Sequence, residues 1–334
     1  MDTSIDLTPL EHVSCFLCNT ADQYDVVYEA RAERDKDVDL GQTLRASGDE
    51  LLIDQLVRCR ICGIQYVNPR LRSDLISSGY NEGEDPAYVS QLEARKRTFA
   101  ASLDRIERAA GGCGRLLDVG TAAGAFVAAA RERGWDAEGC EPNRWLATWG
   151  ARHFGVTIRQ GTLFDQDYPE GSFDVITLWD VIEHTADPPA VLERCRALLR
   201  PGGILVVNYP DIGSWIARVL GRRWLFLTSV HLFYFDRRTI RLMLEKSGYH
   251  VESVRPHVQR LELDYILSRG AVLSPTLSAA ARALARPLKL ARKVVPYWLG
   301  QTFVICRRSM MLVSFSTGFE EAQALLLAVG LSLA

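Results

Sequence analysis

The chain has 334 residues, of which 48% are hydrophobic, so it can bury the core of a main domain together with a smaller unit. Its 39 basic and 41 acidic residues leave a net charge of −2, which excludes the global positive field that favours nucleic acid, and no nucleic-acid partner is expected. Residues 1–11 have neither a basic start nor a continuous apolar run, so we expect no secretory signal and a cytoplasmic protein.

Two Cys-x-x-Cys pairs dominate residues 1–70, namely Cys15 with Cys18 and Cys59 with Cys62. Cysteines of a cytoplasmic protein stay mostly reduced, and four thiolates are the ligand set of tetrahedral structural zinc. The sequence therefore predicts a zinc-ribbon-like module with all four metal positions filled by protein. The long spacer between the pairs leaves a second interpretation open, that of four unrelated reduced cysteines.

Residues 71–110 are predicted to form a helical linker, because apolar side chains recur at near-helical spacing among charges. From Gly114 onward short apolar runs alternate with helical segments, which is typical of buried parallel strands in an α/β protein. The expected strands are 115–120, 135–141, 173–180 and 203–208, and the expected helices are 125–133, 143–154 and 188–199. The fold class is thus a doubly wound, Rossmann-like sheet, which we place in residues 111–308.

A long insert, predicted to be helical, covers about residues 261–295 of this domain. Its stretch 281–294 carries five cations among leucines and valines, which favours either an amphipathic helix in peripheral contact with an anionic membrane or an ordinary solvated helix face. Residues 309–334 form a C-terminal tail whose apolar part, 322–334, is too short to span a bilayer and is expected to be a terminal helix or a frayed end.

The first strand of the sheet leads into a glycine-containing turn, from Asp118 through Gly120 to Gly124. Glycines between a strand and a helix let the backbone approach a ligand closely. Glu141 ends the next expected strand, where a carboxylate can bind both hydroxyls of a ribose. A dinucleotide-binding domain shares these features, but the Gly-x-Gly-x-x-Gly pattern is absent. A nicotinamide-dependent oxidoreductase is therefore the second choice.

The ordered motifs of this region resemble those of class I S-adenosylmethionine-dependent methyltransferases of the ubiquinone-biosynthesis type. The resemblance runs from about residue 114 to residue 254. An alanine, Ala122, stands where the family commonly has the middle glycine of its first motif. The matching motifs are Leu117-Asp-Val-Gly-Thr-Ala-Ala-Gly124, Gly139-Cys-Glu-Pro142, Gly171-Ser-Phe-Asp174, Trp179-Asp-Val-Ile-Glu-His184 and Leu199-Arg-Pro-Gly-Gly203.

The resemblance implies a role for each cofactor-site residue. Glu141 would hold the ribose of S-adenosylmethionine, and Thr162 and Leu163 would lie beside the adenine. Asp180 would close the pocket at the end of the expected strand 173–180. The methionine pocket would be shaped by Asp118, Gly120 and Gly124.

Methyl transfer to a hydroxyl or a carbon acid needs a group that takes up a proton, and histidine does so near neutral pH. His184 follows the expected strand 173–180, and His231 lies in an aromatic loop after the expected strand 203–208. Either could be the base, and each could equally be a structural histidine.

The segment from Cys59 through Gly63 to Pro69 resembles the zinc-ribbon front ends of bacterial methyltransferases that act on sugars, lipid-linked envelope components or secondary metabolites. This implies a small-molecule or lipid-linked acceptor. A different class of function stays open, in which the zinc ribbon is an interaction module on a catalytically idle, cofactor-binding domain.

Overall fold

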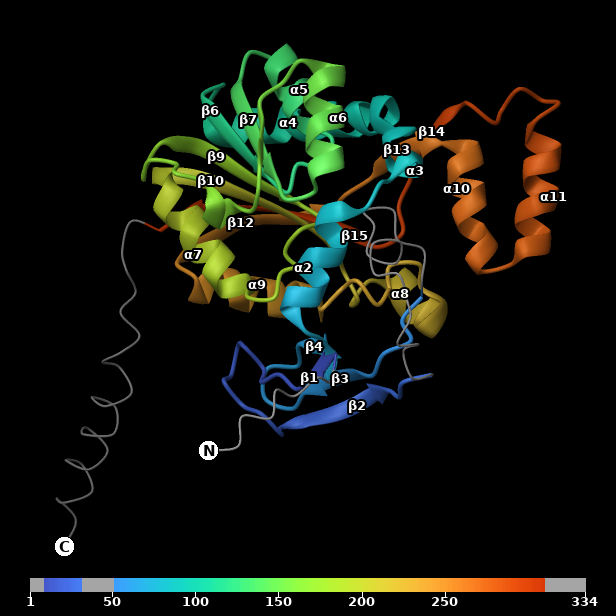
Figure 1. The fold of residues 1–334 in the computed structure, drawn as a ribbon, viewed down its shortest axis with the longest axis horizontal. Coiled ribbons are helices and arrows are strands. Elements are labelled where there is room, and N and C mark those ends of the chain that lie inside the picture. The colour runs from blue at the N-terminus through green and yellow to red at the C-terminus, as the bar shows by residue number, and fades with distance from the viewer. Residues whose placement is uncertain (1–8, 32–50, 310–334) are drawn as a thin grey trace, which may run out of the picture.

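The structure is a computed structural model that describes residues 9–31 and 51–309, so the predicted tail lies almost wholly outside the described residues. Its centre is a seven-stranded mixed sheet in the order β12-β15-β10-β9-β6-β7-β8 (Figure 1). Only β15 runs antiparallel to its neighbours among these strands. The strands are β6 (Arg115–Val119), β7 (Asp136–Glu141), β8 (Ile158–Gln160), β9 (Phe173–Trp179), β10 (Leu199–Pro210), β12 (Tyr249–Pro256) and β15 (Gln301–Arg308).

Helices cover both faces of the sheet, which gives the Rossmann-like architecture expected from the sequence (Figure 1). Because successive side chains of a strand point to opposite faces, Leu116 packs against the layer of α4 and α5, whereas Leu117 belongs to the core under α7 and α9. The helices of the two layers are α4 (Leu92–Ala110), α5 (Ala125–Glu132), α6 (Arg144–Phe154), α7 (Pro188–Leu198) and α9 (Arg237–Lys246).

Helix starts follow the capping residues of the sequence. Asp187 accepts the N–H of Ala190 in front of Pro188, and Asn143 accepts the N–H of Leu146, so α7 and α6 begin where their caps allow. Three short elements complete this part of the chain: η1 (Leu163–Asp165), α8 (Trp215–Leu220) and η2 (Gly221–Arg223).

The N-terminal region forms a four-stranded sheet in the order β11-β4-β3-β2. One of its strands, β11 (Phe233–Tyr234), comes from the loop after β10, so this sheet uses a strand that the sequence placed in the larger domain. A separate pair joins β1 to β5. The N-terminal strands are β1 (Leu10–Glu11), β2 (Tyr24–Tyr28), β3 (Leu56–Cys59), β4 (Gln65–Val67) and β5 (Arg70–Leu71).

Three helices, not one, connect this region to the large sheet. They are α2 (Ser73–Glu82), α3 (Pro86–Val89) and α4. Asp85 caps α3 in front of Pro86, and Gly83 ends α2 in an extended conformation. Of the three, α4 matches the predicted amphipathic helix and packs on α5.

The insert is a helical hairpin on a two-stranded antiparallel ribbon. The ribbon strands β13 (Gln259–Glu262) and β14 (Val294–Tyr297) pair with each other, and between them lie α10 (Leu263–Arg269), η3 (Gly270–Val272) and α11 (Pro275–Ala285). The predicted helix across residues 281–294 is therefore wrong. Pro287 has no N–H for a helical bond, and Lys289 takes a left-handed φ of 54°, so the helix ends at Ala285.

Candidate functional site

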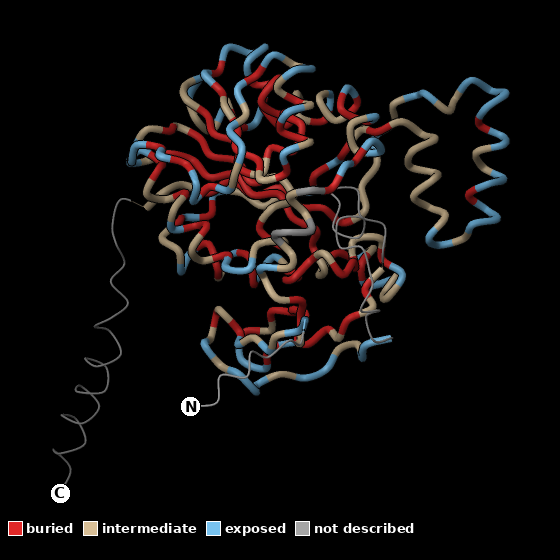
Figure 2. The backbone as a smooth tube through the Cα atoms, viewed as in Figure 1, coloured by how far each residue is buried: buried red, intermediate tan, exposed pale blue. Residues whose placement is uncertain are grey.

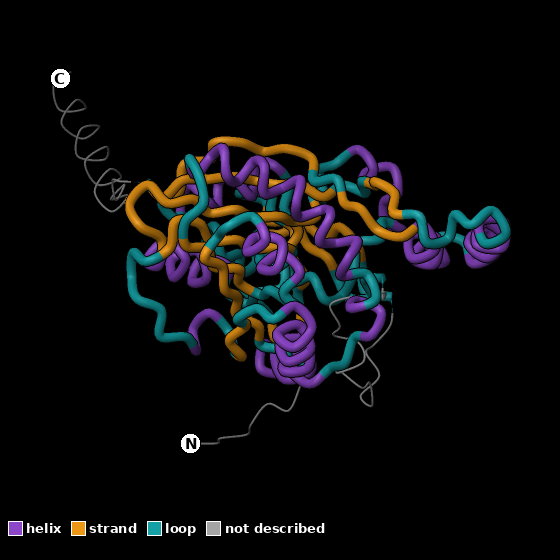
Figure 3. Tube along the Cα trace, turned by 90° about the horizontal axis from the view of Figure 1, so that it is seen from above, coloured by secondary structure: helices purple, strands orange, loops and turns teal. Residues whose placement is uncertain are grey.

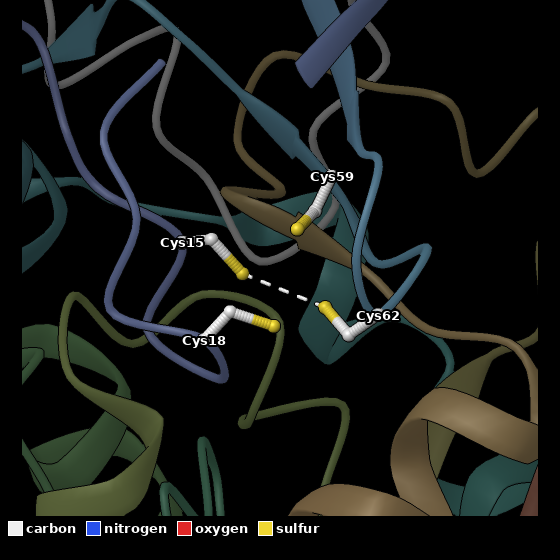
Figure 4. A group of neighbouring side chains, drawn as sticks. All are labelled: Cys15, Cys18, Cys59 and Cys62. Atoms are coloured by element: carbon white, nitrogen blue, oxygen red, sulfur yellow. Dashed lines mark hydrogen bonds between the residues drawn. The ribbon is translucent and has the colours of Figure 1, made fainter. Parts of the chain in front are cut away.

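Four cysteine sulfurs converge between the N-terminal strands, as predicted (Figure 4). The ligand atoms of Cys15, Cys18, Cys59 and Cys62 all lie within 4.8 Å of one another, and the sulfurs of Cys15 and Cys62 are 3.5 Å apart. Two Cys-x-x-Cys turns from distant segments thus point at one place. Four sulfur donors are the set that tetrahedral zinc takes, so the residues present fit this ion.

Without a cation these thiols hold their protons firmly. Burial and the neighbouring sulfurs raise the pKa of Cys18 to about 11. The hydrogen bond with Cys15, together with burial, raises the pKa of Cys62 further. A bound cation reverses this preference because it stabilises the thiolates.

The cofactor loop lies between β6 and α5. Gly120 and Gly124 both have left-handed φ angles, of 65° and 72°, which glycine adopts without strain. Ala122 also has a positive φ of 49°, and its N–H donates to Glu141 Oε2 at 2.8 Å. An alanine in this conformation is uncommon, and the hydrogen bond to Glu141 helps to hold it there.

Asp118 supports the loop from the end of β6. The side chain is 1% exposed, and its two oxygens accept the hydroxyls of Thr121 and Thr177, each at 2.6 Å. Burial raises the pKa of Asp118 to about 7. Its oxygens therefore already have protein partners, which suits a residue that shapes the pocket.

Glu141 ends β7 directly beside the loop and is fully buried. Its Oε1 accepts the N–H of Asn143 and its Oε2 that of Ala122, both at 2.8 Å. The Tyr80 hydroxyl is hydrogen-bonded to the same carboxyl group. Burial raises the pKa of Glu141 to about 7. A carboxylate offers about four lone-pair sites, of which these three donors take three, so one site stays free and the Tyr80 hydroxyl would give up a second to a diol.

Thr162 and Leu163, which follow β8, were predicted to lie beside the adenine of the cofactor. The N–H of Gly161 donates to the backbone oxygen of Glu141 at 2.9 Å, so this turn lies beside the strand end that carries the carboxylate. Thr162 caps η1 and accepts the N–H of Phe164, whereas Leu163 is buried in the core.

Asp180 lies at the end of β9 with a left-handed φ of 52°. It accepts the side-chain amides of Asn208 at 2.6 Å and Gln301 at 2.9 Å. Burial raises its pKa to about 6, against the lowering effect of the nearby Arg95 guanidinium. A positive φ in a non-glycine residue is common at functional sites, and here two amides hold the carboxylate in place.

The two predicted base candidates lie together. The ring centres of His184 and His231 are 4.6 Å apart, and their Nδ1 atoms lie 3.0 Å from the Val230 oxygen and 2.8 Å from the Phe226 oxygen. Since a carbonyl only accepts, each Nδ1 carries the proton and each Nε2 has a free lone pair. Burial lowers the pKa of His184 to about 4 and lowers that of His231 well below its usual value, so both rings are neutral near pH 7.

Glu183 joins this pair. Both of its carboxyl oxygens are buried without a hydrogen-bond partner among the residues that the structure describes, and burial, followed by the charge of Asp180, raises its pKa well above the usual range. The ligand atoms of Glu183, His184 and His231 lie within 4.8 Å of one another. This group can exchange protons with an acceptor or hold a metal ion.

The sequence did not single out two side chains of the linker that reach the site, Tyr80 from α2 and Arg95 from α4. Arg95 lies 4.4 Å above the ring of Tyr88, and its buried Nε has no hydrogen-bond partner among the described residues. Nothing in the linker pattern distinguishes these side chains from ordinary helix-surface residues.

The comparison with protein families decides what this arrangement is: residues 91–254 match the family model of a methyltransferase domain. The chain carries a class I S-adenosylmethionine-dependent methyltransferase domain. The matched residues include the glycine loop, Glu141, Asp180 and both histidines. The predicted methyltransferase domain is thus confirmed, in preference to a nicotinamide-dependent one.

Curated proteins that are similar to this domain are also named methyltransferases. A ubiquinone biosynthesis O-methyltransferase from Cereibacter sphaeroides is 34% identical over 118 residues, which cover 33% of this chain and 48% of the relative. A probable S-adenosylmethionine-dependent methyltransferase from Mycolicibacterium smegmatis is 39% identical over 102 residues, which cover 30% of this chain and 38% of the relative. The chain thus spans about half the length, or less, of these relatives.

Among solved structures, a SAM-dependent methyltransferase from Archaeoglobus fulgidus aligns with a TM-score of 0.46 and 17% identity. The alignment covers 67% of this chain and all of that one.

Proposed function

We propose that the protein transfers the methyl group of S-adenosylmethionine to a small or amphiphilic acceptor, such as a sugar, a lipid-linked envelope component or a secondary metabolite. The observation that carries the proposal is the placement of Glu141. Its carboxylate is fixed by two backbone N–H groups at the end of β7, next to a glycine turn, and would accept the two hydroxyls of a ribose at its free lone-pair site and at the site that the Tyr80 hydroxyl holds. The names of the curated relatives support the reaction class.

When bound, S-adenosylmethionine supplies a methyl group that is already activated on a sulfonium centre, so the protein must mainly position the acceptor and exclude water. In the proposed arrangement Glu141 binds the ribose, and Thr162 and Leu163 flank the adenine. Asp180 closes the inner end of the pocket. Asp118 shapes the methionine side together with Gly120 and Gly124.

One of the two histidines takes the proton that the acceptor loses. Each Nε2 has a lone pair, and each Nδ1–H is fixed on a carbonyl oxygen. The proton that the acceptor loses would move to this Nε2 and then leave to solvent. Glu183, whose raised pKa favours the protonated form, has a carboxyl oxygen within 4.8 Å of a ring nitrogen of each histidine.

We further propose that Cys15, Cys18, Cys59 and Cys62 hold one structural zinc ion. With four sulfur ligands, no coordination position is left for substrate or water, so the ion stabilises the fold and takes no part in the chemistry. The N-terminal region, whose sheet has short strands, gains most from such an ion.

The reaction is tested by measuring S-adenosylhomocysteine release from the zinc-replete protein with three panels of acceptors: sugars and sugar nucleotides, lipid-linked intermediates, and phenolic metabolites. Release that depends on one panel and is lost in Glu141→Ala supports the proposal. S-adenosylmethionine binding without release in any panel would contradict the proposed acceptor classes, and no binding would contradict the reaction itself.

A further inference from the structure

The helical hairpin of the insert stands away from the rest of the molecule (Figures 1 and 3). Its outer helix, α11, has only two buried residues, Ser278 and Ala285. The Ser278 hydroxyl donates to the Leu267 oxygen of α10 at 2.6 Å, and Arg282 binds Asp264 of α10 through two hydrogen bonds of 2.9 Å. The inner side of α11 is thus fixed on α10, and its outer side is exposed (Figure 2).

The outer side carries large apolar side chains. Leu277 is 72% exposed, Leu284 69% and Leu288 65%. Leu277 and Leu284 are seven positions apart on one helix, and two helical turns bring them to the same side. Leu288 follows in the turn after the helix, which ends at Ala285. Several exposed leucines on one projecting element favour an interaction surface.

The segment from η3 through α11 to the loop before β14 carries charge of one sign. Residues 270–293 contain five basic side chains and no acidic one. Arg282 is neutralised by Asp264, whereas the other cations are exposed and form no ion pair with a described residue. These cations are Arg286, Lys289, Arg292 and Lys293. The hairpin thus carries exposed leucines on α11 and, in the loop between α11 and β14, four exposed cations that form no ion pair with a described residue.

The root of the hairpin adjoins the catalytic end of the sheet. Tyr265 of α10, Tyr297 of β14 and Asp180 of the cofactor site all lie close enough to the Arg95 guanidinium to raise its pKa. The ribbon that carries the hairpin thus lies beside Arg95, near Asp180 of the cofactor site.

We propose that the α10–α11 hairpin docks on an anionic lipid surface, with Leu277, Leu284 and Leu288 inserted among the acyl chains and the four cations on the headgroups. The proposal deepens the proposed function and rests on it, because it makes the acceptor a lipid-linked or amphiphilic molecule that is methylated at a membrane. Exposed leucines together with cations that have no ion-pair partner among the described residues are the groups by which a peripheral element binds an anionic membrane. A second copy of the chain fits poorly, because a two-fold contact through this surface would bring like charges together.

The test is co-sedimentation of the full zinc-replete chain with vesicles of phosphatidylcholine alone and of phosphatidylcholine mixed with phosphatidylglycerol. We expect binding to the mixed vesicles that weakens as salt is added. The double variant Leu277→Glu/Leu284→Glu should lower this binding about tenfold or more. The matched control, Val26→Glu/Val219→Glu, makes the same change at two exposed residues outside the hairpin, which are 43% and 74% exposed, and should bind as the wild type does.

Equal binding to both kinds of vesicle, no binding, or the same loss in both double variants would overturn the proposal. So would a wild-type dimer that only the hairpin variant dissociates, since the second copy would then be the occupant. S-adenosylmethionine affinity is measured in parallel on all variants. If it is absent throughout, the proposed reaction fails, while vesicle binding still decides the role of the hairpin.

Discussion

The rings of His184 and His231 lie edge to face with their centres 4.6 Å apart, although they come from the loops after two different strands. Each ring is oriented by a backbone carbonyl, so the two Nε2 lone pairs are the unused acceptors of the pair. Two neutral imidazoles beside a carboxyl group that holds its proton give the site a proton acceptor that stays neutral across the physiological pH range.

Replacing the base should reduce turnover and leave cofactor binding intact. We expect the Gln variant of whichever histidine acts as base, His184→Gln or His231→Gln, to lower kcat about 10²- to 10⁴-fold, because general-base catalysis contributes that much. The control is His257→Gln, a buried histidine with its pKa also lowered to about 4 but packed on Trp179 and Phe303. Wild-type turnover in both site variants would rule out a histidine base.

Cofactor affinity should depend on pH through Glu141. Burial raises its pKa to about 7, so the carboxylate that accepts ribose hydroxyls forms only as the pH rises through that value. S-adenosylmethionine affinity should therefore increase about tenfold from about pH 6 to about pH 8. Titration calorimetry of wild type and Glu141→Gln at each pH isolates this effect, because the ratio of the two affinities cancels the titration of the ligand. A ratio that does not change with pH would contradict the assignment of Glu141 as the residue that binds the ribose.

Zinc content should follow the four clustered cysteines. Elemental analysis should find one zinc per chain in the wild type and none in Cys59→Ser, which removes a fully buried ligand. Cys113→Ser is the matched control, because Cys113 is exposed and remote from the cluster, and it should retain the metal. Full zinc content in Cys59→Ser would exclude the proposed site.

The cysteine turns should unfold together with the large domain. Arg238 of α9 donates to the Cys62 oxygen, and Lys246 of the same helix donates to the Leu17 oxygen at 2.8 Å. Removing both cations should lower the melting temperature or split one thermal transition into two. The double variant Arg238→Ala/Lys246→Ala is compared with Arg241→Ala, whose exposed side chain pairs within α9. Identical melting of both variants would show that these contacts do not couple the two parts.

Local pattern was sufficient to predict most of the large sheet. Strands such as 173–179 are continuous apolar runs, and the helices between them carry their own caps, as at Asn143 and Asp187. The cluster of four cysteines was predicted as well, because each Cys-x-x-Cys turn places two sulfurs side by side and two such turns suit one metal ion.

Long-range pairing could not be predicted in this way. Strand β11 has two residues, too few for a periodic signal, yet it joins β4 of the N-terminal sheet. Tyr80 reaches Glu141 only because Asn143 Nδ2 binds the backbone oxygens of Tyr80 and Gly83 and fixes the end of α2 over the pocket. In the insert, the charge pattern predicted a helix across 281–294, but the helix ends at Ala285, before Pro287 and Lys289.

None of the helices in residues 9–31 and 51–309 is both long and apolar enough to cross a membrane. Contact of the hairpin with lipid would accordingly be made at the surface of a bilayer.

The central claim, that Glu141 and the glycine turn bind S-adenosylmethionine, is tested most directly by calorimetric titration of the zinc-replete protein with S-adenosylmethionine and, separately, with NADH. The account predicts one S-adenosylmethionine site per chain, no response to NADH, and loss of the site in Glu141→Ala. Binding of NADH, or unchanged S-adenosylmethionine binding by Glu141→Ala, would contradict it.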